Sequence, residues 1–432
     1  MTGHALGAAD KWYLLRVRRY LLAGIGPVAL AGTHFLISFA MLRLDAPAAF
    51  GIFTFLFVAA QFTVAISAAL FGAPLQALAA SRAREERDAA AAAIVTAAAF
   101  MAVVTGLAFV ALSFVMGLWG KAALFYGLYS GTMIVRWVGR SWCYAADKQM
   151  RPALSDIIYA VVTLSTFAAA ILAFPGVPES ACYAALALGS TCSLLAFGRR
   201  YGAMLITLPS RRAWGVYRAI WHSQSRWALL GVATTEAVAN AHIYLVTLFA
   251  GAEAVAPLAA AALMLRPINV VQNALIEYER PQMATLIGAG ALAELRQTKR
   301  LFLGVLLVAW LGSSLLALGV VNFAPWLVFS PAYDLAVIET GSLLWVLVTL
   351  LILLQVPANV MLQAAGEFRG LARATIWSSV VSVIGVAVVL SLVDPVWTIA
   401  AIAIGWIVDL ALVRRCAAQW WRRLTAPAAP RL

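Results

Sequence analysis

The sequence contains few charged residues, and this scarcity excludes an ordinary soluble domain. Asp, Glu, Lys and Arg make up 11% of the 432 residues, whereas soluble domains carry about 25%. Hydrophobic residues supply 64% of the chain. Uncharged runs at 89–120 and 301–333 exceed the roughly 20 apolar residues that a helix needs to cross a bilayer. We therefore expect a polytopic membrane protein.

Cysteines and acidic residues are also scarce. The four cysteines lie in or beside apolar segments and lack the spacing of zinc ligands or of a disulfide framework. The excess of 31 basic over 18 acidic residues could suggest nucleic acid as a partner. The long uncharged runs leave no continuous basic surface, so we expect no nucleic-acid partner, no metal and no cofactor.

Division of the chain at its charge clusters predicts twelve transmembrane helices. They cover 20–42, 51–73, 90–116, 122–140, 155–174, 180–197, 227–249, 255–277, 301–322, 338–361, 374–393 and 397–413. If the N-terminus is cytoplasmic, 27 of the 31 basic residues fall on the cytoplasmic side. Arg43 and Lys121 lie outside, and Arg136 and Arg266 lie within spans. The positive-inside rule therefore predicts that both termini face the cytoplasm.

The two halves of the chain resemble each other. His34 and Pro74 recur as His242 and Pro281, and segment 145–151 recurs at 364–369; chance alignment of Ala- and Leu-rich sequence is the alternative. A parallel repeat predicts an all-helical fold of two six-helix lobes, related by a pseudo-two-fold axis along the membrane normal, around a central cavity. We expect lobes at 1–198 and 227–432, joined by a basic, aromatic, amphipathic linker at 199–226.

Polar residues inside a bilayer are costly and therefore mark candidate sites. They form three stripes at helical spacing: Arg266, Asn269, Asn273 and Glu277; Glu236, Asn240 and Tyr244; and Gln355, Asn359 and Gln363. We expect these stripes to line one cavity in which Arg266 meets an anionic substrate and Glu236 serves as its partner or as a cation site. The alternative is a structural Glu236–Arg266 ion pair, with the amides making interhelical hydrogen bonds.

Arg136 and Arg140 lie one turn apart near the inner end of their span. We expect both to extend toward the membrane surface, and Arg136 is also a candidate substrate contact. Asp156 is expected to face Arg151.

Three other ionisable residues have simpler expected roles. Asp409 is interpreted as a near-surface partner of Arg414. His34 and His242 occupy equivalent repeat positions and are interpreted as hydrogen-bonded packing residues rather than as a proton relay.

Two segments resemble a known family. They are WALLGVATTEAVANAHIYLVTLFAGAEAVAPLAAAALMLRPINVVQNALIEYERPQMATL (227–286) and QAAGEFRGLARATIWSSVVSVIGVAVVL (363–390). With the span count and topology of the whole chain, they make it similar to the O-antigen and exopolysaccharide flippases of the multidrug, oligosaccharidyl-lipid and polysaccharide (MOP) exporter superfamily.

This resemblance implies a monomeric transporter, not an enzyme, in the bacterial inner membrane. It would flip a polyprenyl-pyrophosphate-linked oligosaccharide by alternating access, beside a polysaccharide polymerase and export machinery. In such flippases, cationic residues on the first, second and eighth spans meet the pyrophosphate. Arg266 matches the eighth-span position, but the first two spans contain no basic residue, so Arg43 and Arg136 are the nearest substitutes.

Three alternatives remain. A cation-coupled drug exporter of the same superfamily usually carries an acidic residue on the first span, and this chain has none there. A major-facilitator carrier usually has an Asp, Arg and Gly signature between spans 2 and 3, which the segment at 81–88 lacks. A membrane-embedded polysaccharide polymerase would need an outer-loop acid/base pair, and only scattered single charges occur. The glycan and the coupling ion stay open.

Overall fold

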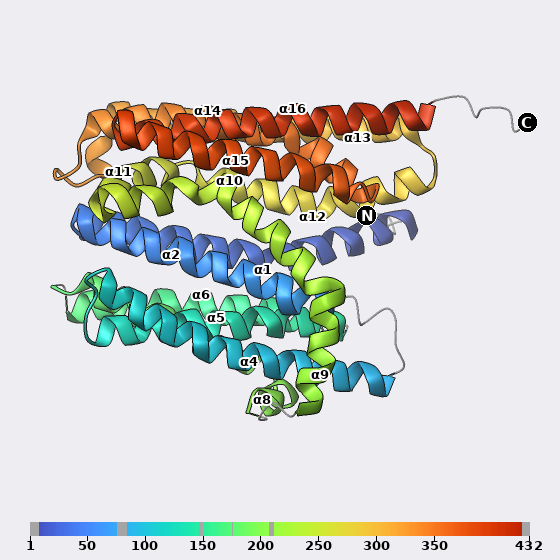
Figure 1. Cartoon of the computed structure of the whole chain (residues 1–432), viewed down its shortest axis with the longest axis horizontal. Helices are drawn as coiled ribbons and strands as arrows, with labels where there is room; N and C mark the ends of the chain where they lie inside the picture. Colours follow the sequence, from blue (N-terminus) through green and yellow to red (C-terminus); the bar gives the residue numbers. More distant parts are fainter. Residues whose placement is uncertain are drawn as a thin grey trace, which may run out of the picture. The chain divides into compact units, whose positions relative to one another are not determined.

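The computed structural model describes residues 8–75, 84–146, 148, 150–174, 176–206 and 211–425. Within these ranges the regular elements are all helical (Figure 1). The predicted all-helical fold is therefore confirmed.

The helices before the chain midpoint are α1 (Ala8–Leu44), α2 (Pro47–Ser67) with a π-helical extension (Ala68–Gly72), α4 (Arg84–Val115), α5 (Lys121–Ala145), α6 (Met150–Ala173) and α7 (Pro178–Ser193). Two short helices follow, α8 (Arg199–Ile206) and α9 (Arg211–Ile220). The remainder of the chain forms α10 (Arg226–Ala250), α11 (Ala252–Leu263), α12 (Arg266–Gly288), α13 (Leu292–Phe323), α14 (Leu335–Ala364), α15 (Phe368–Leu392) and α16 (Thr398–Thr425).

The count of apolar spans differs from the predicted twelve. Ten helices in the described ranges are long and apolar enough to cross a membrane, or eleven if α11 and α12 are counted as one bent span. Helix α5, with 25 residues, is long enough to cross a bilayer but is made less apolar by Arg136 and Arg140. The helices make the protein a multi-pass membrane protein.

The predicted span at 255–277 is not one straight helix. It breaks at Met264 and Leu265, and its two parts, α11 and α12, are bent by 57°. Pro267 stands at the start of α12, where a missing N–H is tolerated, and its ring disfavours helical geometry at the preceding residue. The break therefore places Arg266 at the first position of a new helix.

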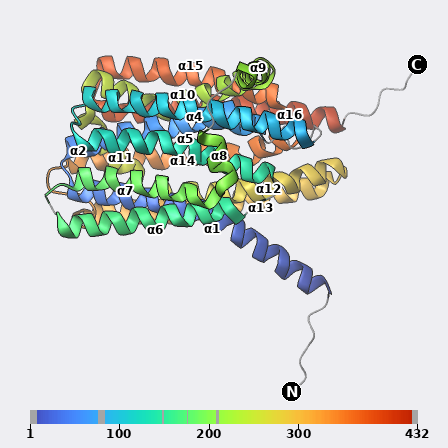
Figure 2. The same ribbon diagram turned by 90° about the horizontal axis from the view of Figure 1, so that it is seen from below.

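The chain divides into two compact units. The first contains residues 1–41 and 59–229. In it α6 runs alongside α7, and α4 packs on α5 (Figure 2). Helices α8 and α9 also pack on α4. The Tyr201 hydroxyl donates to the Val135 carbonyl at 2.5 Å, and Ser225 donates to the Leu70 carbonyl at 2.9 Å, so the linker segment is attached to this unit.

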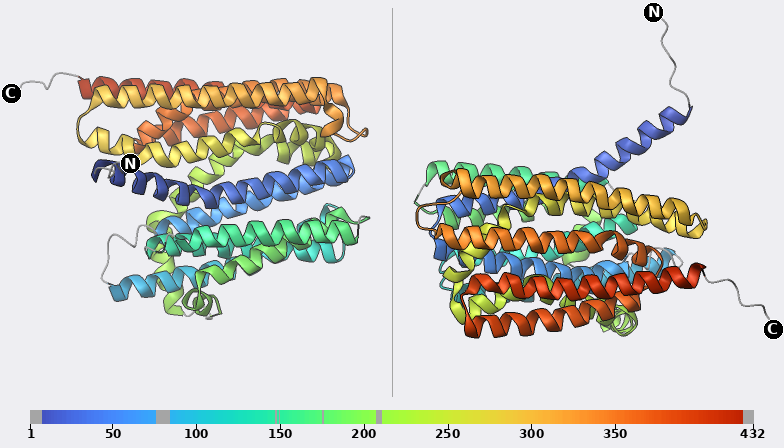
Figure 3. Two further views of the ribbon diagram at one scale, coloured as in Figure 1. Left: turned by 180° about the vertical axis from the view of Figure 1, so that it is seen from behind. Right: turned by 90° about the horizontal axis from the view of Figure 1, so that it is seen from above.

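The second unit contains residues 42–58 and 230–432. In it α15 and α16 lie side by side, and α14 packs on both α13 and α16 (Figure 3). Its buried core includes Phe302, Met361 and Trp420.

The same close helix contact occurs in each unit. A Cβ atom added at Gly189 of α7 would lie 1.9 Å from Thr163 Oγ1 of α6, and one added at Gly405 of α16 would lie 1.9 Å from Ser382 Oγ of α15. The glycines are 216 residues apart and the hydroxyl residues 219. These separations are close to those of the sequence repeat at 145–151 and 364–369, so the packing of the two helix pairs follows the repeat.

Candidate functional site

Arg266 lines a cavity of about 220 Å³ that lies within the second unit. We call it the Arg266 cavity. Its polar lining residues come from α2, α10, α12, α14 and α16: Thr54, Asn240, His242, Arg266, Asn269, Trp345, Thr349 and Trp406. The structure thus brings together three of the predicted site residues, Arg266, Asn269 and Asn240.

The described residues that line the Arg266 cavity carry charge of one sign. Arg266 is the permanently charged residue among them, and none of them is acidic. Arg266 begins α12, and the N-terminal end of a helix carries a partial positive charge. The amides of Asn240 and Asn269 add N–H donors. The cavity is therefore suited to an anion.

His242 also lines the Arg266 cavity and is 2% exposed. Its ring packs edge-on against the Trp345 indole, with centroids 5.4 Å apart. Among the described residues its Nδ1 atom has no hydrogen-bond partner. The predicted packing role is borne out by the Trp345 contact, but the unpartnered Nδ1 atom does not fit the prediction that the ring is hydrogen-bonded.

Glu236 does not line the Arg266 cavity. Its carboxylate accepts a hydrogen bond of 2.5 Å from the Tyr244 hydroxyl. Glu236, Asn240 and Tyr244 belong to the face of α10 that the spacing predicted. The carboxylate of Glu236 is thus bound by a residue of its own helix.

A second cavity of about 180 Å³ also lies within the second unit. We call it the Asp409 cavity. Its polar lining residues are Thr235, Gln272, Arg280, Gln355, Asn359, Gln363, Thr375, Trp406 and Asp409. Ile352 and Trp406 line both cavities.

The expectation of one cavity lined by three stripes is therefore wrong. Gln355 and Asn359 line the Asp409 cavity, apart from Arg266. The residues of α12 that face the Asp409 cavity are Gln272, Ile276 and Arg280, whereas Asn273 is exposed. All of these α12 residues lie after the break, so the break does not separate them. Residues at different positions along one helix line the two cavities, with Arg266 and Asn269 at one and Gln272, Ile276 and Arg280 at the other. The side chain of Glu277 lies outside the described residues.

Asp409 corrects a second expectation. It is 4% exposed and lines a cavity together with Gln355, while Arg414 is exposed. It is therefore no near-surface partner of Arg414. Sequence reasoning could have found it from depth, since Asp409 lies eleven residues after Thr398, about 17 Å along a helix.

Arg136 and Arg140 do not extend to the membrane surface. Arg136 is 0% and Arg140 6% exposed, and both form ion pairs with Asp156, which is 1% exposed. The Arg136 Nε atom also donates to Ser155 Oγ at 3.2 Å, and its guanidinium lies 4.6 Å from the Tyr159 ring centroid. A buried carboxylate on α6 holds both cations inside the first unit, and Arg136 lines neither cavity.

Three further residues with predicted roles, Arg151, His34 and Arg43, form the following contacts. Arg151 does not face Asp156 but donates to the Phe197 carbonyl. His34 Nε2 lies 3.1 Å from the Tyr159 hydroxyl, which confirms its hydrogen-bonded packing role. Arg43 donates to the Phe329 carbonyl at 3.1 Å and lines neither cavity.

Comparison with known proteins gives matches at the level of structure. No protein-family model matches the chain, and no curated protein matches it significantly. A MOP superfamily transporter from Pyrococcus furiosus, described as having a binding pocket of reversed polarity, is similar with a TM-score of 0.63, 16% identity, and coverage of 95% of this chain and 96% of that one. An inward-facing multidrug resistance MATE family transporter of the MOP superfamily is similar with a TM-score of 0.62 at 16% identity and the same coverage.

An outward-facing MATE family transporter is also similar, with a TM-score of 0.59 and 16% identity. The chain has the fold of these transporters. Because the identities are low, the likeness concerns the fold.

Proposed function

We propose that this protein is a transporter that flips a polyprenyl-pyrophosphate-linked oligosaccharide across the bacterial inner membrane by alternating access. The observation that supports it is the Arg266 cavity, whose described lining contains a permanent positive charge and no acidic residue. Similar proteins are known in inward- and outward-facing states, which is consistent with alternating access. The resemblance of segments 227–286 and 363–390 to polysaccharide flippases supports the lipid-linked substrate.

A pyrophosphate group fits the chemistry of the Arg266 cavity. A guanidinium offers a planar fork of N–H donors that matches phosphate oxygens, and it keeps its charge at any physiological pH. The amide groups of Asn240 and Asn269 can donate to further oxygens. In this proposal Arg266 carries the electrostatic attraction, and the amides orient the headgroup.

Export of cationic drugs is the second candidate function, and the multidrug transporters among the structural neighbours favour it. An organic cation needs an acidic or aromatic surface. Trp345 and Trp406 give the Arg266 cavity aromatic surface, but Arg266 repels a cation and no acidic residue is among the described lining, which favours the anionic substrate.

The proposal predicts a charge requirement at Arg266. In cells that depend on this protein for polysaccharide export, Arg266→Ala is expected to abolish surface polymer and to cause lipid-linked oligosaccharide to accumulate. Arg266→Lys keeps the charge but loses the fork of donors and is expected to retain partial export. The measurements are surface polymer, lipid-linked sugar and the amount of protein in the membrane.

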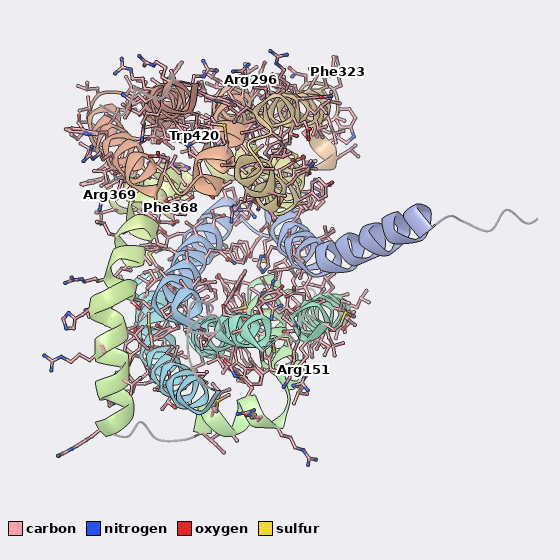
Figure 4. All side chains as sticks on the ribbon, turned by 90° about the vertical axis from the view of Figure 1, so that its right-hand side faces the viewer. Arg151, Arg296, Phe323, Phe368, Arg369 and Trp420 are labelled. Atoms are coloured by element: carbon pink, nitrogen blue, oxygen red, sulfur yellow. The ribbon has the colours of Figure 1, made fainter. Side chains whose placement is uncertain are left out.

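Arg369→Ala is the matched control. Arg369 is an exposed arginine on α15, labelled at the edge of the second unit in Figure 4, and its loss should leave export unchanged. Normal export by Arg266→Ala would contradict the proposal. Loss of drug resistance with normal polymer export would favour the second candidate.

A further inference from the structure

Basic residues gather where α13 begins and α16 ends. Arg296 and Lys299 lie one turn apart on α13, and Figure 4 labels Arg296 at this end of the second unit. The Arg296 guanidinium lies 5.0 Å from the ring centroid of Trp421 on α16, and an indole face attracts a cation. Arg414 precedes Trp421 by two helical turns on the same face of α16. The start of α13 therefore faces the end of α16, and both present cations.

Apolar side chains hold these two helix ends together. Leu295 and Phe302 of α13 belong to the same buried cluster as Val413, Ala417 and Trp420 of α16. The basic side chains therefore project from packed helices, whose positions are set by a common core.

The cations at this end lack acidic partners. The sequence contains no Asp or Glu at 295–333 or at 410–432. In the part of the chain that the structure describes, no ion pair involves Arg296, Lys299 or Arg414. Lys299 is half-buried, and the positive charge of Arg414 acts on its ammonium group. Like charges repel, so an anion bound between these side chains would be stabilised.

Two acidic residues lie near the three cations along the chain, but neither neutralises them. Glu367 is paired with Arg423 at 3.0 Å. Glu294 is exposed in the first turn of α13. It is two residues from Arg296, so its side chain leaves the helix about 200° away.

Arg414 lies at the level of the lipid headgroups. The apolar span that contains α16 begins at Pro395, and the 19 residues from there to Arg414 rise about 29 Å as a helix. The hydrocarbon core of a bilayer is about 30 Å thick. Ile407, seven residues before Arg414 and on the same face, is 50% exposed, and Ile404 is 54% exposed. This face of α16 therefore meets lipid chains below Arg414 and headgroups beside it.

These features select the class of ligand. Ammonium and guanidinium groups bind phosphate oxygens strongly, and basic pockets between transmembrane helices bind the headgroups of anionic lipids. A zwitterionic lipid carries its own cation, which the three basic residues repel. A soluble anion has no chain to cover the exposed isoleucines.

We propose that Arg296, Lys299 and Arg414 bind the phosphate of an anionic phospholipid whose acyl chains lie along Ile404 and Ile407. The site goes beyond the proposed function, because this lipid stays in its leaflet and is not transported. None of the three basic residues lines the Arg266 cavity or the Asp409 cavity. The bound lipid would join the start of α13 to the end of α16.

The experiment is native mass spectrometry of the purified full-length protein with added dioleoyl phosphatidylglycerol. The wild type is expected to retain one molecule of this lipid tightly and to bind dioleoyl phosphatidylcholine much more weakly. Each basic residue near an anionic lipid contributes about a factor of five in affinity, so Lys299→Gln with Arg414→Gln is expected to weaken retention about 25-fold. Lys299→Arg with Arg414→Lys keeps both charges and should retain the lipid.

Arg369→Gln with Arg373→Gln is the matched control. It removes two exposed charges from α15 and should leave the tightly bound lipid in place. Equal retention of both phospholipids by the wild type would overturn the proposal, as would an equal loss in the control and in Lys299→Gln with Arg414→Gln. Displacement of phosphatidylglycerol by an equal concentration of undecaprenyl phosphate would assign the site to the transported lipid and would also overturn it.

Arg266→Ala should bind phosphatidylglycerol like the wild type, because Arg266 lies in a separate cavity. Failure of the flippase proposal and failure of the phospholipid site are therefore distinguishable.

Discussion

At the scale of single residues, one buried carboxylate forms ion pairs with two buried arginines. Asp156 forms ion pairs with Arg136 and Arg140, and the three side chains are almost fully buried. Two guanidinium groups share one carboxylate, and the contacts of Arg136 with Ser155 and with the Tyr159 ring contribute to holding the extra charge. The cluster joins α5 to α6 inside the first unit.

Loss of Asp156 should therefore destabilise the protein. Asp156→Asn leaves two arginines buried with no carboxylate, and breaking a buried pair from one side costs about 3–5 kcal/mol. We expect a clear fall in the thermal unfolding temperature of the purified protein. Asp394→Asn, an exposed carboxylate, should unfold like the wild type; equal unfolding temperatures for both variants would show that the cluster contributes little.

The ion pair between Arg136 and Asp156 could not be predicted from the sequence. Arg136 and Asp156 are 20 residues apart on successive helices, and their meeting depends on how those helices rotate and pack. The sequence placed Arg136 within a helix correctly, but charge and spacing alone could not distinguish a side chain that extends to the membrane surface from one in a buried ion pair. Arg266 does line a cavity, and the signal was available in the sequence because an ionisable residue deep in an apolar run is costly when it faces lipid.

At the scale of elements, helices could be predicted well and their faces less well. Long apolar runs between charge clusters define most helices, because burial in lipid requires little more than length and hydrophobicity. The predicted span at 255–277 breaks before Arg266, and of the stripe predicted on it Arg266 and Asn269 line a cavity, whereas Asn273 is exposed. A proline inside an apolar run was the available signal.

The close contact between α15 and α16 gives a test at this scale. Gly405→Ala would place a Cβ atom 1.9 Å from Ser382 Oγ, and overpacking of this kind costs about 1–3 kcal/mol. The variant is expected to unfold at a lower temperature. Adding Ser382→Gly removes the obstructing atoms and should restore part of the loss.

Gly304→Ala is the control, because nothing lies within 4 Å of the added atom. If Gly405→Ala were as stable as Gly304→Ala, the close approach of the two helices would be contradicted.

At the scale of the whole molecule, two cavities of different character lie in the second unit. Among the described lining residues, the Arg266 cavity has a basic residue and no acidic one, whereas the Asp409 cavity has the buried Asp409 and the exposed Arg280. Ile352 and Trp406 line both cavities, so the two cavities adjoin each other.

The most direct test of the central claim is a flipping measurement with purified protein in proteoliposomes. Lipid-linked oligosaccharide is placed in both leaflets, and the sugar is oxidised by membrane-impermeant periodate added outside. With the wild type the oxidised fraction should rise beyond the outer-leaflet share, whereas Arg266→Ala should resemble protein-free liposomes. A wild-type fraction that stays at the outer-leaflet share, with correctly inserted protein, would contradict the account.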